Sequence, residues 1–229
     1  MKTKKTAVVV LKTIDWRELL LGAALPSVEL KRLKRGGGLA AHPELLALAG
    51  CKQDPVWHPE GDVWAHTLLC LDHFASERSG DEREDYLVGL AVCCHDMGKP
   101  AVTRLREKRI VARGHEGAAQ APARSFLARL GVAPENIEEV VALVLCHMRP
   151  VQLYAARSGD PAVRRLAVAV RGRLDRLVRL CRADEAGRFL KGKPDFPAGD
   201  WLLERYRAIE NPPRKTARPA APRRGPARR

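Results

Sequence analysis

The sequence predicts an all-α fold, a helical bundle, and three observations support this prediction. Between residues 61 and 210, apolar residues recur at helical spacing and strand-like alternation is scarce. Gly131, Pro150 and Gly159 separate the periodic segments. The chain has 229 residues, of which 45% are hydrophobic and 30% charged, which suits one main globular domain and excludes a largely disordered protein.

The first sixty residues are expected to pack on this bundle as an N-terminal segment. Residues 16–24 have helical spacing, the glycines at 36–38 indicate a loop, and residues 42–50 indicate a short helix.

The bundle itself, residues 61–210, is expected to open with a helix over 62–76 that Asp62 caps. A second helix is expected over 82–96, since Gly98 and Pro100 follow it and stop it. The alternating basic stretch at 102–112 predicts a short β-hairpin or an ordered loop. The remaining helices are expected at 116–130, 134–147, 161–186 with a break at Gly172, and 200–210.

The last nineteen residues, 211–229, are expected to form a disordered basic tail. They contain seven Lys or Arg and no acidic residue, and their prolines oppose both helix and strand. The whole chain has a formal net charge of +14. The tail is therefore expected either to contact RNA through its charge or to act only as a solubilising extension.

Hydropathy and cysteine spacing indicate a cytoplasmic protein with no membrane contact. No run approaches the ~20 apolar residues that a membrane helix needs, and the N-terminal apolar stretch is too short for a secretory signal. The six cysteines form no CxxC pair, so buried, reduced thiols are expected.

Four histidines in apolar settings are candidate functional residues: His66, His95, His115 and His147. One such histidine alone is more often a hydrogen-bonded core residue than a ligand. The set is more informative, because Asp96 follows His95 at the end of an apolar run and a buried carboxylate needs a partner or a cation.

These residues predict a metal site. His66 would supply an imidazole from the preceding helix, the pair His95 and Asp96 two more groups, and Asp184 a carboxylate from a late helix. Nitrogen and oxygen donors of this kind suit a divalent ion such as Mn, Fe, Co, Ni, Mg or Zn, and leave positions for water and a phosphate oxygen.

The order His, His-Asp, Asp resembles the signature of the HD superfamily of metal-dependent phosphohydrolases. A longer series resembles the HD domain of bacterial CCA-adding tRNA nucleotidyltransferases over roughly residues 40–210. This series reads WHPEGDVWAHTLLCLD, HDMGKP, GHEGA, HMRP, RADEAGR and FPAGDWL. The nucleotidyltransferase head of those enzymes has no room in the first sixty residues, so CCA addition is not expected.

The resemblance implies a metal-dependent phosphohydrolase, acting as a phosphomonoesterase or a 2′,3′-cyclic phosphodiesterase on nucleotides or RNA ends. Asp96 would serve both as ligand and in catalysis. Lys99 would balance charge on the phosphate, or be an ordinary lysine at a helix end. His115 and His147 would bind a second metal or phosphate, or be structural, and a single tightly bound ion is favoured.

Two arginines are further candidates. Arg149 and Arg188 could clamp phosphate through paired N–H groups, or be a helix-end residue and a salt bridge. Two other functions remain open from the sequence: a catalytically quiet RNA-binding module, and an HD hydrolase of a small signalling nucleotide such as a cyclic dinucleotide or a guanosine polyphosphate.

Overall fold

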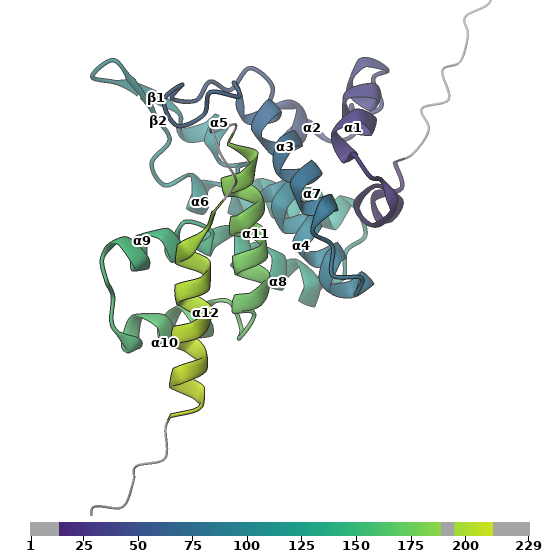
Figure 1. Ribbon diagram of the computed structural model, residues 1–229. Helices are drawn as coiled ribbons and strands as arrows, with labels where there is room; N and C mark the ends of the chain where they lie inside the picture. Colours follow the sequence, from purple (N-terminus) through teal and green to yellow (C-terminus); the bar gives the residue numbers. More distant parts are fainter. Residues whose placement is uncertain (1–13, 189–194, 213–229) are drawn as a thin grey trace, which may run out of the picture.

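The computed structural model describes residues 14–188 and 195–212. Helices dominate this part of the chain and one small antiparallel hairpin accompanies them, so the predicted all-α bundle with a short hairpin is confirmed (Figure 1). The elements are η1 (Glu18–Gly22), α1 (Pro26–Arg35), α2 (Pro43–Leu46), α3 (Val63–Ser76), α4 (Glu82–Cys94), α5 (Lys99–Val102), β1 (Arg104–Arg106), β2 (Arg109–Val111), α6 (His115–Ala118), α7 (Gln120–Arg129), α8 (Pro134–Cys146), α9 (Arg149–Ala155), α10 (Asp160–Ala169), α11 (Leu174–Gly187) and α12 (Pro197–Glu210). The predicted basic tail lies outside the described residues from position 213 on.

Helices α3, α4, α8 and α11 form the centre of the bundle, and α11 packs along α3 and α4. Leu71 of α3, Leu90 of α4 and Leu180 of α11 are fully buried there. The start of α3 is fixed as the sequence predicts, because the Asp62 side chain accepts a hydrogen bond from the Ala65 N–H. Most of the candidate site residues lie in these central helices or directly after their last residue.

The described part of the first sixty residues packs against the bundle. Leu30 of α1 and Leu45 of α2 are buried, and α1 lies along α3. The Trp16 ring makes edge-on contacts with the rings of His42 and Phe126. None of the helices in residues 14–188 and 195–212 is long and apolar enough to cross a membrane.

Three helices among the described residues were not expected from the sequence, and one of them is the short α5, where Gly98 and Pro100 indicate a helix stop. Helix α9 begins at Arg149, where Pro150 had indicated a gap between helices. Proline is well suited to the first turn of a helix, since the N–H groups there have no intrahelical partner. The amphipathic helix α1 was also missed. The break expected at Gly172 is present, with that residue at φ +78° between α10 and α11.

A buried arginine fixes α11 against its neighbours. The side chain of Arg176 is completely buried and lies between Glu84 of α4 and Glu139 of α8. Its Nε donates to Glu84 Oε2 over 2.6 Å. Breaking such a pair by removing one partner leaves a buried charge, so the network holds α11 in one position. Asp184 follows two turns later on the same helix.

The hairpin stands at one end of the bundle, away from α10 and α12 (Figure 1). Arg104 of β1 pairs with Val111 of β2 and Arg106 pairs with Arg109. Glu107 and Lys108 turn the chain with φ angles of 47° and 64°, the left-handed conformation that a two-residue hairpin of type I′ requires. The inner side of the hairpin forms one wall of the cavity described next.

Candidate metal centre

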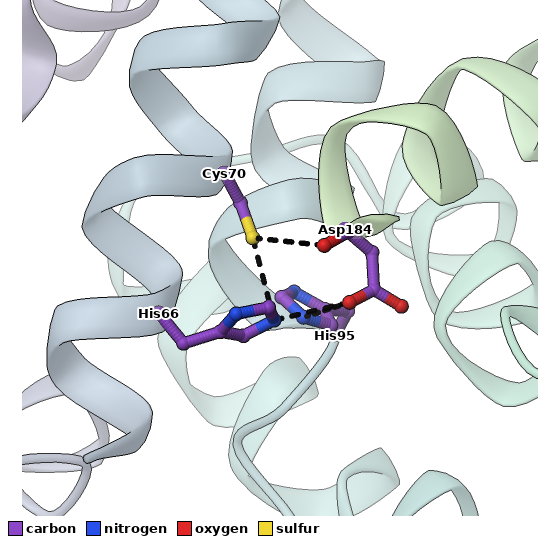
Figure 2. Close-up of side chains that lie close together, drawn as sticks. All are labelled: His66, Cys70, His95 and Asp184. Carbon is purple, nitrogen blue, oxygen red and sulfur yellow. Dashed lines mark hydrogen bonds and ion pairs between the residues drawn. The ribbon is translucent and has the colours of Figure 1, made fainter. Parts of the chain in front are cut away.

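Three helices bring the predicted ligands together in the buried middle of the bundle. His66 comes from α3, His95 and Asp96 follow α4, and Asp184 lies near the end of α11. Figure 2 shows His66, His95 and Asp184 facing one another. His66 Nε2 lies 3.0 Å from Asp184 Oδ1 and 3.8 Å from Asp96 Oδ2, and His95 Nε2 lies 3.3 Å from Asp96 Oδ2.

Backbone contacts orient three of the histidine rings at this centre. The Nδ1 atoms of His95, His115 and His147 each lie 2.7–2.9 Å from the backbone carbonyl three residues earlier. A carbonyl only accepts, so each Nδ1 is the donor and each ring directs its Nε2 inward. This is the tautomer that a metal ligand needs, with its ring orientation held by the backbone.

Several polar atoms of the centre have no hydrogen-bond partner among the described residues. They are His95 Nε2 and both carboxylate oxygens of Asp96, all of them buried. Lys99 Nζ lies 2.7 Å from Asp96 Oδ2, an ion pair without hydrogen-bond geometry. Buried polar atoms are normally satisfied, so this cluster of lone pairs fits a bound cation.

The two carboxylates remain charged in the centre. Burial acts to raise the pKa of Asp96, but the positive charge of Lys99 and the neighbouring His95 outweigh it and hold that pKa well below its ordinary value. For Asp184, burial is outweighed in the same way by Arg188, with His66 next. Two buried carboxylates beside imidazole nitrogens therefore suit a divalent ion.

A second group of donors adjoins the first through Asp96. His115 Nε2 lies 3.4 Å from Asp96 Oδ1 and 3.1 Å from His147 Nε2. With both Nδ1 atoms acting as donors, neutral rings would set two lone pairs against each other. The contact therefore needs a cation between the rings, either a proton or a metal ion. Burial lowers the pKa of His147 to about 4, so this ring is neutral near pH 7.

A cavity of about 280 Å³ opens beside both groups. Lys99 and Arg188 line it together with His115, His147 and Asp184. Arg188 Nη2 lies 3.6 Å from Asp184 Oδ2. A larger cavity of about 1030 Å³, lined by Trp16 and Arg129 among others, includes none of the predicted site residues.

Arg149 belongs to neither donor group and does not line this cavity. Its side chain is exposed and its Nη1 donates to Gln152 over 3.3 Å, one turn along α9. This position matches the second alternative for Arg149, an exposed arginine at a helix end.

The chain is similar in sequence to several multifunctional CCA proteins. No protein-family model matches it. The multifunctional CCA protein of Halorhodospira halophila is 34% identical over 203 residues, which cover 84% of this chain and 46% of that protein. The chain is homologous to the multifunctional CCA proteins. Those of Xanthomonas campestris pv. campestris and Laribacter hongkongensis are 33% and 34% identical over 82% and 76% of the chain.

This homology confirms the resemblance that the motif series indicates. The chain spans less than half the length of these multifunctional CCA proteins, 42–46% in the three compared.

The structure adds two residues to those that the resemblance to CCA proteins indicates. Cys70 Sγ lies 3.4 Å from His66 Nε2, and both belong to a group of possible ligands with His95 and Asp184 (Figure 2). Cys70 is four residues after His66, on the same helix face, a spacing that could have identified it. Gly187 makes room for the sulfur, since a Cβ there would lie 2.3 Å from it.

The second addition is Glu60, whose Oε1 lies 2.7 Å from His66 Nδ1 and 2.8 Å from His58 Nδ1. Although burial acts to raise it, the contacts with His58 and His66 lower the pKa of Glu60 to about 2. The carboxylate therefore stays charged and orients the His66 ring with Nε2 toward the centre. No periodic pattern in the sequence identifies this loop residue.

Proposed function

We propose that the chain is a metal-dependent phosphohydrolase that cleaves phosphate esters of nucleotides or RNA ends. The main observation is the buried group of polar atoms without hydrogen-bond partners on His95 and Asp96, together with His66 and Asp184, beside a cavity lined by Lys99. Homology to the multifunctional CCA proteins supports a nucleotide or an RNA end as the substrate.

In this proposal His66, His95, Asp96 and Asp184 hold the ion. A divalent ion at such a site supplies Lewis-acid polarisation of a phosphoryl oxygen and lowers the pKa of a bound water. Nitrogen and oxygen donors suit Mn, Fe, Co, Ni, Mg or Zn.

The remaining residues act on the phosphate. Lys99 is held at the cavity wall by Gln53 Oε1, to which its Nζ donates over 2.7 Å. Its ammonium group would offset negative charge that develops on the phosphate, and the Arg188 guanidinium would add further N–H donors. Both cations already lie beside carboxylates, so they are in position before the substrate arrives.

A substrate panel tests this proposal. The full chain, reconstituted with each metal in turn, is assayed for phosphate release or ring opening with 2′,3′-cyclic nucleotides, 2′- and 3′-nucleotides, a cyclic dinucleotide and a guanosine polyphosphate. We expect turnover of nucleoside phosphates. Turnover of only the last two would indicate a signalling-nucleotide hydrolase, and binding of RNA without any turnover would indicate a quiet RNA-binding module.

The sequence favours a single tightly bound ion, and the geometry supports adding a second, weaker one. Asp96, His115 and His147 would hold it, because Asp96 Oδ1 faces them while Oδ2 faces His95. We expect elemental analysis to find about two ions per chain at saturating metal. His115→Ala or His147→Ala should lower this toward one and spare the tight ion. A wild-type content near one, unchanged in both variants, would instead assign the two histidines to phosphate contact.

A further inference from the structure

Trp57 is a large aromatic side chain left exposed at the wall of the catalytic cavity. It lies in the loop between α2 and α3, is 56% exposed, and lines the same cavity as Lys99 and Arg188. Trp16 and Trp64, by contrast, are buried in the core. A tryptophan with more than half of its surface exposed leaves a large apolar contact area uncovered, so its position at the cavity calls for an explanation.

The loop around Trp57 is firmly held. The Asp54 carbonyl accepts the N–H groups of Trp57 and His58 over 3.1 and 2.9 Å. The Asp54 side chain accepts from the Val56 N–H and from Arg109 Nε of strand β2, each over 3.0 Å. His58 in turn contacts Glu60, which orients His66. These contacts tie the backbone of the Trp57 loop to the hairpin on one side and, through His58 and Glu60, to the metal centre on the other.

The cavity is small, and Lys99, Arg188 and Trp57 all line it. A volume of about 280 Å³ lies at the small end of ligand pockets. A phosphate with its sugar would occupy much of this volume beside Lys99, His115 and Arg188. A base attached to that sugar would then extend toward Trp57.

The surface around this cavity is basic. Lys52 lines the cavity and is exposed, and the adjoining hairpin segment presents further exposed cations with one exposed acid, Glu107. These cations are Arg104, Arg106, Lys108, Arg109 and Arg113. Aromatic rings set among cations are the combination by which proteins hold unpaired bases and their phosphates.

We propose that Trp57 is a stacking platform for the unpaired base of the substrate, so that the centre selects a phosphate ester attached to a nucleoside. This inference rests on the proposed function for the place of the phosphate. Stacking would act on any base, since every base offers an aromatic face. Selectivity would therefore be for nucleotides over simple phosphate esters rather than for one base.

Binding and kinetics of the metal-loaded full chain test the inference. The probes are inorganic phosphate, β-glycerophosphate and adenosine 3′-phosphorothioate, with a 3′-phosphorylated hexaribonucleotide to distinguish an RNA end from a free nucleotide. Trp57→Ala should weaken binding of the adenosine probe about tenfold to hundredfold and leave inorganic phosphate unchanged. Trp57→Phe should restore most of the affinity. Val56→Ala is the matched control, since Val56 is exposed on the same loop and does not line the cavity.

The outcomes separate this inference from the proposed function. Equal affinity of wild type and Trp57→Ala for the adenosine probe would overturn the stacking role, whatever the turnover of β-glycerophosphate. Loss of adenosine binding in Trp57→Ala, in a protein that hydrolyses none of these esters, would support the platform and reject the hydrolase. Tighter, salt-dependent binding of the hexaribonucleotide that also depends on Trp57 would identify the source of the base as an RNA end.

Discussion

Asp96→Ala is expected to reduce phosphate-ester hydrolysis by about 10³-fold or more and to lower bound metal sharply. Its carboxylate faces both donor groups, with Oδ2 3.3 Å from His95 Nε2 and Oδ1 3.4 Å from His115 Nε2. Loss of a ligand that positions the ion removes several kcal/mol of transition-state stabilisation, and each 1.36 kcal/mol is tenfold in rate. Turnover and elemental metal content, measured on the same samples, check the expectation.

Two further variants make this result specific. Asp96→Asn keeps the shape of the side chain and should show the same loss, which would assign the effect to the carboxylate charge. Asp200→Ala removes a carboxylate that pairs with Arg182 on the exposed surface, and it should leave rate and metal content unchanged. An Asp96→Ala protein that is folded and turns over at the wild-type rate would remove Asp96 from the mechanism.

Gly98→Ala is expected to damage both the fold and the centre. The backbone of Gly98 is in the ordinary helical region, so alanine is excluded by space alone. A Cβ there would lie 2.0 Å from the His115 carbonyl oxygen and 2.5 Å from the Ala119 nitrogen. Helix α6 must move away, which separates His115 from Asp96. We expect a stability loss of about 3 kcal/mol, and a melting temperature lower by roughly 6–12 °C.

Gly117→Ala is the matched control for this substitution. Gly117 lies in the same short helix α6, and a Cβ there would meet nothing within 4 Å. Because alanine favours helix over glycine, the melting temperature should stay the same or rise slightly. If Gly98→Ala also melted at the wild-type temperature and kept its metal, the close packing of α6 on the His-Asp turn would be contradicted.

The helices could be predicted where apolar periodicity coincided with a local start or stop signal. Asp62 caps α3 as its position suggests. Pro150 misled the prediction, because proline both ends helices and begins them, and α9 uses it in the first turn. Which of these two roles a proline takes depends on the packing of the next segment, and that is not a local property.

Some residues of the candidate site could likewise be predicted from the sequence, and others could not. The sequence indicates His66, His95 and Asp184 by residue type, and the structure places them within contact of one another. Glu60 and Gln53 could not be identified, since they act only through the folding of a loop onto His66 and Lys99. The roles assigned to all these residues remain predictions for the variants described above.

Metal removal and return test the central claim most directly. The full chain is freed of metal with a chelator, and the hydrolysis of a 2′,3′-cyclic nucleotide is followed as ions are added back and their content is measured. We expect no turnover without metal, and a rate that rises in proportion to occupancy of the tight site. A chelated protein that contains no metal and hydrolyses the nucleotide at the full rate would contradict the account.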